Sequence, residues 1–404
     1  MHPSELSIED FTYELPDERI AKYPLEHRDA SKLLVYKKGA LAEDTYRNIA
    51  GRIPNNALML FNQTKVVQAR LLFKKDTGGM IEVFCLEPHE QYSDIQTAML
   101  QHGKVWWKCI IGGASKWKHG MVLQQIHEGL TLSASIVERD MGSFTLELSW
   151  DNDLSFAEVL SIAGKVPLPP YLHREVEESD KERYQTIYAK EKGSVAAPTA
   201  GLHFTDAVMQ KLDDKCIEQE FITLHVGAGT FMPVKSDTMQ GHDMHAEWID
   251  VEVDTINKLI QAKEEGRKVV AVGTTTMRTL ESLYWIGAKL LEHRTPDLSG
   301  YAVTQWEPYE LSGTHNAKDA LKALVDWLLL NKQHKLLTRT QILIAPGYTT
   351  RIIDGLVTNF HQPQSTLLLL VAAMIGDDWR KVYDHAMQND FRFLSYGDGC
   401  LLWQ

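Results

Sequence analysis

The sequence predicts an α/β (α+β) protein that carries a smaller all-β module as an insertion. Three observations predict this class. Residues 69–149 alternate apolar and polar side chains as strands do, and helical and strand-like patterns alternate from Ser155 onward. A strand-like run, Ala57 to Phe61, is expected to be the opening strand of the α/β domain. We therefore assign residues 1–68 and 150–404 to the main domain and residues 69–149 to the inserted domain.

Each element follows from its periodicity. In the inserted module, strands are expected at Met80–Phe84, Leu130–Ile136 and Ser143–Leu148, with glycine turns between them at residues 78–79, 112–113 and 142. In the main domain, the apolar spacing predicts helices over residues 155–163, 205–215, 254–266, 276–291, 317–330, 367–375 and 378–388. Ser365 is the expected N-cap of the helix at residues 367–375, and Gly376 its stop.

The composition is that of a folded, soluble chain. Of its 404 residues, 44% are hydrophobic and 24% are charged, which suffices for two domains and a large core. The N-terminal stretch lacks the apolar segment of a signal peptide, and the longest apolar run, Leu367 to Ile375, is about half a membrane span. The four cysteines are scattered without metal-type spacing. We therefore expect a cytoplasmic protein with reduced thiols and no membrane contact.

The net charge of −12 argues against a surface coated with basic residues for bulk nucleic-acid binding. Local basic stretches remain at residues 65–75, 104–118 and 332–339. In the second of these, lysines alternate with Trp106, Trp107 and Trp117. Such a stretch either contacts phosphates and stacks on bases, or forms amphipathic strands with solvated lysines.

Several loops have the composition of a ligand site. Gly193–Thr205, which reads GSVAAPTAGLHFT, combines hydroxyl and imidazole groups with small residues, and Thr205 is a natural N-cap. Apolar, strand-like runs at residues 221–226, 269–272 and 342–345 each end in a glycine-containing polar turn, and the polar stretch 358–366 precedes an apolar helix. Loops of this kind suggest one composite site, although any one of them alone is equally typical of a structural turn.

Ten segments together carry a family resemblance. The chain closely resembles the S-adenosylmethionine:tRNA ribosyltransferase-isomerases of queuosine biosynthesis, and the motifs follow in order along nearly the whole sequence. They are RDASKLLV (28–35), TGGMIEVFCLEP (77–88), VPLPPYL (166–172), ERYQTIYA (182–189), GSVAAPTAGLHFT (193–205), LHVGAGTFMPV (224–234), VGTTTMRTLES (272–282), PGY (346–348), TNFHQPQSTLLLLVAA (358–373) and SYGD (395–398).

The resemblance implies an unusual use of S-adenosylmethionine. Enzymes of this family transfer its ribosyl part, not its methyl group, to 7-aminomethyl-7-deazaguanine in a tRNA anticodon, giving epoxyqueuosine and releasing adenine and methionine. It also implies a larger barrel-like α/β domain with a smaller inserted β-barrel, no metal, and tRNA as partner. We expect a monomer, with a homodimer as the alternative. No G-x-G-x-x-G follows any strand, so the sequence does not suggest a dinucleotide-type fold.

The implied chemistry needs proton transfers, because the attacking amine must be neutral and the departing adenine must gain a proton. The sulfonium also acidifies the adjacent 5′-methylene. The acid–base candidates are the motif residues His203, His225, His245, His361 and Glu247, with Glu281 and Asp398 as further carboxylates.

The binding candidates come from the same motifs. If Thr274 to Thr276 begin a helix, its N-terminus and Arg278 offer an anion site for a carboxylate or phosphate, whereas the alternative for Arg278 and Glu281 is a surface pair at i,i+3. Tyr184, Gln185 and Tyr188, at a spacing expected on a helix, either contact the deazaguanine or belong to the core. The cofactor-binding candidates are Thr199, Thr205, Gly227, Gly229, Thr274, Thr275, Arg278, Glu281, Asn359 and Ser365; the substrate-binding candidates are Tyr184, Gln185, Lys65, Arg70 and Asp398.

Two alternative functions stay open. His242, His245 and Glu247 suggest a metal-dependent hydrolase, although they lack the i,i+4 histidine pair of a helical zinc site. The second alternative is a non-catalytic tRNA-binding protein of the same fold. It stays open because residues 62–65 and 112–117 depart from the family pattern. In the first departure, Lys65 stands where the family typically has arginine, which keeps the charge but loses bidentate geometry. The chain also has extra sequence at residues 292–339, and its predicted helix is expected to pack on the main domain or on a partner.

Overall fold

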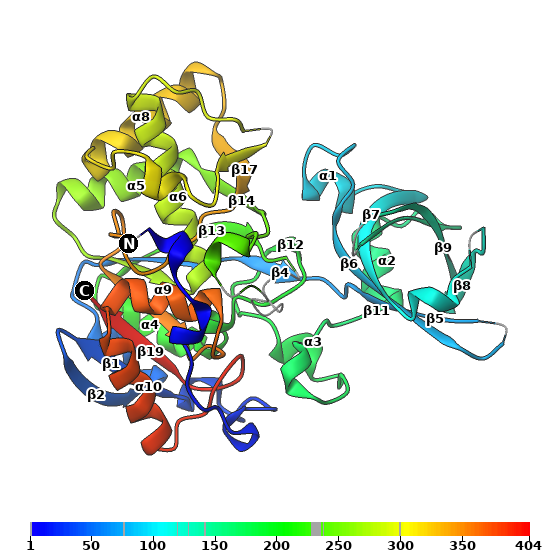
Figure 1. The fold of residues 1–404 in the computed structure, drawn as a ribbon, viewed down its shortest axis with the longest axis horizontal. Coiled ribbons are helices and arrows are strands. Elements are labelled where there is room, and N and C mark those ends of the chain that lie inside the picture. Colours follow the sequence, from blue (N-terminus) through cyan, green and yellow to red (C-terminus); the bar gives the residue numbers. More distant parts are fainter. Residues whose placement is uncertain are drawn as a thin grey trace.

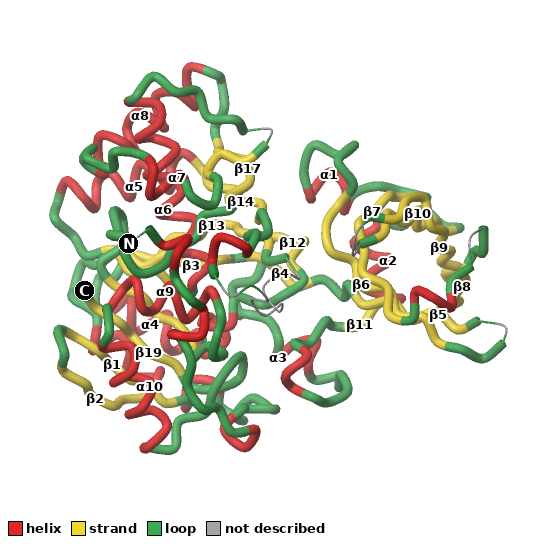
Figure 2. The backbone as a smooth tube through the Cα atoms, in the orientation of Figure 1, coloured by secondary structure: helices red, strands yellow, loops and turns green. Residues whose placement is uncertain are grey.

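The computed structural model describes residues 2–75, 77–118, 120–127, 129–140, 143–227, 236, 238–298 and 300–404. It is a mixed α/β protein with one large sheet and one small, curled sheet (Figures 1 and 2). The predicted α/β class is therefore confirmed. Each sheet has its own apolar core, and the two cores share no residue.

The large sheet has ten strands in the order β16-β17-β14-β13-β3-β15-β18-β19-β1-β2. Its central strands pair in parallel from β13 through β3 and β15 to β18, and antiparallel pairs flank this region. The bounds are β1 Lys32–Lys37, β2 Ala40–Thr45, β3 Leu58–Asn62, β13 Glu218–His225, β14 Glu247–Glu252, β15 Val269–Val272, β16 Tyr301–Val303, β17 Lys335–Thr340, β18 Gly355–Asn359 and β19 Gly399–Trp403.

The central strands are apolar on both faces because helices and loops cover both. Successive side chains of a strand point to opposite faces, so Leu58 and Leu60 of β3 join one core while Met59 and Phe61 join another. Parallel strands of this kind place their carboxyl ends at one edge of the sheet. The loops that leave β15 and β18 therefore meet at that edge.

Helices α5, α6 and α8 form one packed group, and α6 is the longest helix described (Figure 1). Helix α8 coincides with the helix predicted in the extra segment, and it packs on the large unit as expected. The helix bounds are α1 Ile95–Met99, α2 Phe156–Ala163, α3 Asp180–Arg183, α4 Asp206–Asp214, α5 Val253–Glu264, α6 Thr274–Leu291, α7 Glu307–Glu310, α8 Ala317–Leu330, α9 Thr366–Ile375 and α10 Asp378–Gln388.

The predicted helix ends are confirmed at two places. The hydroxyl of Thr205 accepts from Val208 N–H at the start of α4, and that of Ser365 accepts from Leu368 N–H at the start of α9. Gly376 ends α9 with a φ of 61°, a conformation that favours glycine. These caps fix where the two helices begin beside the loops of interest.

The small sheet has seven strands in the order β11-β5-β6-β7-β10-β9-β8, and it curls so that β5 and β8 come close (Figure 1). Trp107 and Trp117 lie in its core, while Lys104 and Lys108 pair with carboxylates outside it. The amphipathic interpretation of residues 104–118 is therefore confirmed. The bounds are β5 Arg70–Lys74, β6 Met80–Pro88, β7 Lys104–Gly112, β8 Leu123–His127, β9 Leu130–Arg139, β10 Phe144–Trp150 and β11 Gly164–Lys165.

A short two-stranded parallel sheet lies where the chain passes between the units. It pairs β4, Thr64–Val66, with β12, Glu191–Ser194. The chain leaves the large unit after β4 and enters the small sheet at β5, and β11 pairs back onto β5 before the return. Helix α2 packs into the core of the small sheet.

Three expectations about local structure are wrong. Ala57–Phe61 does not open the main sheet, because β1 and β2 precede it in the chain and join the same sheet. Residues 342–345 are buried but unpaired, because β17 has already ended at Thr340. Tyr184 and Gln185 follow α3 instead of lying on a helix, since α3 ends at Arg183.

Candidate functional site

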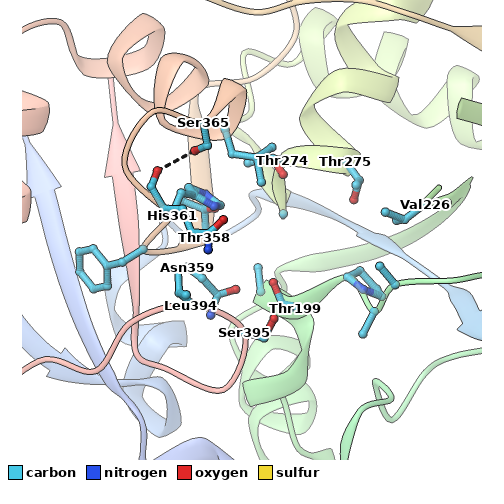
Figure 3. A pocket seen from close by; sticks show the side chains of 18 of the residues that line it. Thr199, Val226, Thr274, Thr275, Thr358, Asn359, His361, Ser365, Leu394 and Ser395 are labelled. Carbon is cyan, nitrogen blue, oxygen red and sulfur yellow. Dashed lines mark hydrogen bonds between the residues drawn. The ribbon is translucent and has the colours of Figure 1, made fainter. Parts of the chain in front are cut away.

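A pocket opens at the edge of the large sheet where β15 and β18 end. The empty space among its lining atoms is about 750 Å³, open solvent included. Figure 3 shows side chains converging on it from η8 (Thr199–His203), from the start of α6 and from the loop between β18 and α9. We call it the threonine pocket. Its polar lining includes Tyr171, Tyr184, Thr199, Thr274, Thr275, Thr358, Asn359, His361, Gln362, Ser365 and Ser395.

The N-terminus of α6 forms one wall of this pocket. Gly273 caps the helix with a φ of 93°, which only glycine adopts readily, and Thr274 and Thr275 follow in the first turn. The first N–H groups of a helix have no partner within it, and the helix dipole favours negative charge there. This wall therefore offers hydrogen-bond donors and a positive partial charge. The predicted helix start is confirmed to within two residues.

The opposite wall is the loop between β18 and α9. The side-chain nitrogen of Asn359 lies 3.3 Å from His203 Nε2 and 3.5 Å from the carbonyl of Asp398. Its Oδ1 atom is buried and has no hydrogen-bond partner in the part of the chain that the structure describes. Because an unpaired buried carbonyl is costly, this oxygen is available to a donor from a ligand.

His361 lies beside Asn359 and is buried. One ring nitrogen, Nε2, lies 2.8 Å from the hydroxyl of Thr358. Its backbone is held on both sides, since Tyr13 donates to its carbonyl and its N–H donates to the Tyr383 hydroxyl. Burial lowers the pKa of His361 to about 3, so the imidazole is neutral at physiological pH. A neutral imidazole can accept a hydrogen bond from a ligand.

Two tyrosines complete the lining. Tyr171 and Ser395 hydroxyls lie 2.6 Å apart, whereas the hydroxyl of Tyr184 is buried with no partner among the described residues. Burial raises the pKa of Tyr184, which therefore keeps its proton and can donate it in a hydrogen bond. The wall thus presents an unpaired donor and an unpaired acceptor.

A second pocket adjoins the first and shares Gln362, Ser365 and Leu367 with it. We call it the arginine pocket, because Arg278 lies in its wall together with Glu247 and His245. Arg278 and Glu247 form a buried ion pair, with side chains 7% and 4% exposed. The two pockets form one continuous candidate site across the edge of the sheet.

Arg278 is only partly satisfied by its neighbours. Its Nη1 donates to Glu247, and its Nε donates to the carbonyl of Ile342 at 3.2 Å. Its Nη2 is buried without a partner among the described residues. A buried guanidinium with a free N–H group favours an anionic acceptor such as a carboxylate. The alternative of a surface pair between Arg278 and Glu281 is wrong, because both side chains are buried and Arg278 pairs with Glu247.

His245 and Glu247 therefore share one pocket, but their environments differ. His245 is exposed at the pocket mouth, while one oxygen of Glu247 pairs with Arg278 and the other accepts from Gly227 N–H at 3.4 Å. Gly229, the other glycine predicted to bind the cofactor, lies outside the described residues. Within the described ranges, no group of three or more His, Cys, Asp or Glu side chains is placed to hold a metal ion.

The structure places His203 and His225 outside both pockets. His203 stacks on Tyr46, with ring centroids 4.3 Å apart, and burial lowers its pKa to about 3. His225 lies 3.0 Å from the hydroxyl of Thr64, and burial lowers its pKa to about 4. His203 nevertheless contacts Asn359, so it supports a pocket residue from behind.

Four other predicted site residues have all or most of their polar groups engaged in the fold. Glu281 accepts four hydrogen bonds from Tyr348 and from the backbone of residues 351–353. Asp398 accepts from the backbone of Lys32 and Arg392, and Gln185 pairs with both backbone groups of Val66. Thr205 caps α4. None of these four residues lines either pocket.

Lys65 and Arg70 lie toward the small sheet, also away from both pockets. Arg70 pairs with Glu82 of the neighbouring strand. Lys65 lies on β4 and lines a groove between the units. The candidate site therefore combines Tyr184, Thr199, Thr274, Thr275, Asn359, His361 and Ser365 in one pocket with His245, Glu247 and Arg278 in the next.

Sequence reasoning missed several lining residues. Tyr171, Ser395, Thr358 and Gln362 line the threonine pocket but were not singled out. Each lies inside a segment that carries the family resemblance, namely residues 166–172, 358–373 and 395–398. The signal was thus present in the motifs, but a hydroxyl or amide without an obvious chemical role gives no reason to select it.

Comparisons with known proteins agree over the whole chain. The family model described as "Queuosine biosynthesis protein" matches residues 8–402. The S-adenosylmethionine:tRNA ribosyltransferase-isomerase of Halothermothrix orenii (strain H 168) is 38% identical over 403 residues, covering 98% of this chain and all of the relative. The crystal structure of the S-adenosylmethionine tRNA ribosyltransferase of Thermotoga maritima is 28% identical, with a TM-score of 0.46, over 97% of this chain and 99% of that one. The chain belongs to the queuosine biosynthesis protein family.

Proposed function

We propose that this protein is an S-adenosylmethionine:tRNA ribosyltransferase-isomerase. It transfers the ribosyl part of S-adenosylmethionine to 7-aminomethyl-7-deazaguanine in a tRNA anticodon and isomerises it, releasing adenine and methionine. Family membership over residues 8–402 and the 38% identical relative of that name support this activity. The two adjoining pockets supply a site with a polar lining at the edge of the large sheet.

One observation carries the placement of the cofactor. The pocket walls contain three buried polar atoms without partners among the described residues: Asn359 Oδ1 and Tyr184 Oη in the threonine pocket, and Arg278 Nη2 in the arginine pocket. The acceptor and the neutral donor suit the amino group and ring nitrogens of adenine. The cationic donor suits the methionine carboxylate. We propose that S-adenosylmethionine spans both pockets, with its sulfonium near Ser365 and Gln362, which both pockets share.

Proton transfer follows from this placement. Burial lowers the pKa of His361 to about 3, so we assign this neutral imidazole the role of hydrogen-bond acceptor beside the ribosyl group. His245 is exposed in the wall of the arginine pocket, and we assign the proton-transfer role to it. Glu247 orients Arg278 through their ion pair. His203 and His225 act in our proposal only as neutral supports of the site walls.

We also propose that the small sheet belongs to an inserted barrel domain. The core shared by β5 to β10 with α2, and the pairing of β11 with β5, support an inserted barrel domain that ends near Lys165, later than the boundary at residue 149. The curl that brings β5 near β8 supports the barrel shape.

Among the described residues, no helix is both long and apolar enough to span a membrane. We propose a cytoplasmic monomer that binds tRNA without a metal.

The test is to incubate the purified protein with S-adenosylmethionine and tRNA bearing 7-aminomethyl-7-deazaguanine, and to follow free adenine and the nucleoside mass. We expect adenine release and a nucleoside of the epoxyqueuosine mass. In Arg278→Met, the KM for S-adenosylmethionine should rise at least tenfold, since a charged hydrogen bond contributes about 1.5–3 kcal/mol. Glu264→Gln, on the exposed face of α5, is the matched control and should behave as wild type. Recovery of intact cofactor and unchanged tRNA would instead indicate a non-catalytic tRNA-binding protein.

A further inference from the structure

A basic groove lies where the chain passes between the large unit and the small sheet. Its lining includes Lys65, Lys181 and Lys192 and contains no Asp or Glu. Both crossings contribute to it, through residues 66–68 on the way out and Val166 on the way back. A molecule held in this groove would therefore contact both units.

Two of these lysines lie side by side on paired strands. Lys65 on β4 and Lys192 on β12 are register partners in the two-stranded parallel sheet. Like charges on paired strands repel and destabilise the pairing. Neither lysine has an ion-pair partner within 4 Å among the described residues. The hydrogen bonds from Ser155 are the main cause that lowers the pKa of Glu158, and the charge of Lys192 is a lesser one. Both lysine side chains can therefore pair with an external anion.

The third lysine is less constrained. Lys181 pairs with Glu178 at 2.8 Å, and these side chains are 46% and 83% exposed. Such exposed pairs contribute little and exchange readily for another anion. All three lysines are thus accessible to a negatively charged ligand.

Residues that line the groove are close along the chain to residues that line the threonine pocket. Tyr184 lines the pocket and the next residue, Gln185, lines the groove. Lys192 and the pocket residue Ala196 are four residues apart, which limits their separation to about 14 Å. A strand of a few nucleotides can therefore place one nucleotide beside the pocket and its neighbours in the groove.

The groove contains lysines but no aromatic side chain among its lining residues. Lysine binds phosphate as a point charge, whereas base recognition in single strands relies on aromatic stacking. In a chain of net charge −12, a local cluster of this kind is needed to attract a polyanion at all. We propose that the groove binds the RNA backbone phosphates next to the nucleotide that meets the cofactor beside the threonine pocket. This assignment rests on the proposed function for the identity of that nucleotide.

The test measures RNA binding without any reaction. An unmodified RNA hairpin with the sequence of a tRNA anticodon arm is titrated with protein between about 50 and 200 mM salt, with binding followed by fluorescence anisotropy. The double variant Lys65→Gln/Lys192→Gln is compared with the control variant Lys37→Gln/Lys318→Gln. The control removes the same charge from β1 and α8, which lie on parts of the large unit away from the small sheet (Figure 1). Unfolding curves of both variants establish that they are folded.

We expect the groove variant to bind roughly tenfold more weakly at the lower salt concentration, and its log–log salt slope to fall by about 2. The control variant should keep the wild-type slope. Wild-type affinity and slope in the groove variant would overturn the proposal. Equal competition by polyglutamate would also overturn it, by showing that the groove recognises charge without preference for RNA. Because the readout needs neither S-adenosylmethionine nor turnover, a failure of the proposed reaction would leave it unaffected.

Discussion

Substitution of Glu281 best distinguishes a structural role of this residue from a ligand-binding role. Its carboxylate is fully buried in α6, and each oxygen accepts two hydrogen bonds. One oxygen accepts from Ile352 and Ile353 N–H at 2.9 and 3.2 Å, and the other from the Tyr348 hydroxyl and Arg351 N–H at 2.7 and 2.8 Å. Burial raises the pKa of Glu281, but only the ionised form can accept all four bonds.

The substitution Glu281→Gln replaces one acceptor oxygen with an NH2 donor. In the better orientation the amide faces Arg351 N–H, so that bond is lost, while the Tyr348 hydroxyl can rotate and accept. The two remaining backbone bonds lose their charge assistance. A bond to a charged acceptor contributes about 1.5–3 kcal/mol and a neutral one about 0.5–1.5 kcal/mol. After allowance for the easier burial of a neutral amide, we expect a loss of about 3 kcal/mol in the free energy of unfolding.

Urea unfolding monitored by fluorescence measures this loss, with Glu264→Gln as the control. Glu264 pairs with Lys322 on the surface, so its substitution should change stability by at most about 0.5 kcal/mol. In the folded fraction of Glu281→Gln, the KM for S-adenosylmethionine should stay near that of the wild type. A variant of wild-type stability with greatly weakened cofactor binding would refute the structural role and restore Glu281 as a ligand.

Two further outcomes follow from buried groups. Burial lowers the pKa values of His203, His225 and His361 from 6.5 to about 3 or 4. The unfolded chain therefore binds more protons than the folded one, and stability falls as the pH drops below about 6.5. At about pH 5.5 each histidine should lower the free energy of unfolding by about 1.4 kcal/mol, and a free energy of unfolding that is flat between pH 7 and 5.5 would contradict this. Gly287→Ala places a Cβ 1.9 Å from the Ala320 carbonyl and should cost about 1–3 kcal/mol or more by moving α8 off α6. The control Gly51→Ala, with nothing within 4 Å, should be near neutral in thermal unfolding.

Local patterns predicted most helices well, because capping and apolar spacing are properties of short segments. The helix at residues 317–330 matches in both bounds, and Thr205 and Ser365 cap the helices they were expected to cap. Strand partners could not be read in the same way. The early strands β1 and β2 are not evident from the sequence, because β2 has no buried residue and the other neighbour of β1 is β19, far along the chain.

The site was predictable as a set of loops but not as a set of roles. The loops after β15 and β18 do meet, as the carboxyl ends of neighbouring parallel strands must. The sequence could not show that Glu281 faces the residues 348–353, or that Asp398 and Gln185 bind backbone groups. Such partners are set by tertiary contacts, and a buried carboxylate in a structural turn has the same sequence signature as one beside a ligand.

The position of β19 affects how the protein is made. β19 lies between β18 and β1, and pairs in parallel with β1. β1 ends at Lys37 and β19 begins at Gly399, so the ribosome must add more than 360 residues before β1 gains this neighbour. The small sheet, by contrast, is contiguous from β5 to β11 and can form while synthesis continues. We therefore expect nascent chains to carry a finished small unit beside an open sheet edge, which makes the large unit the slow and aggregation-prone step of biogenesis.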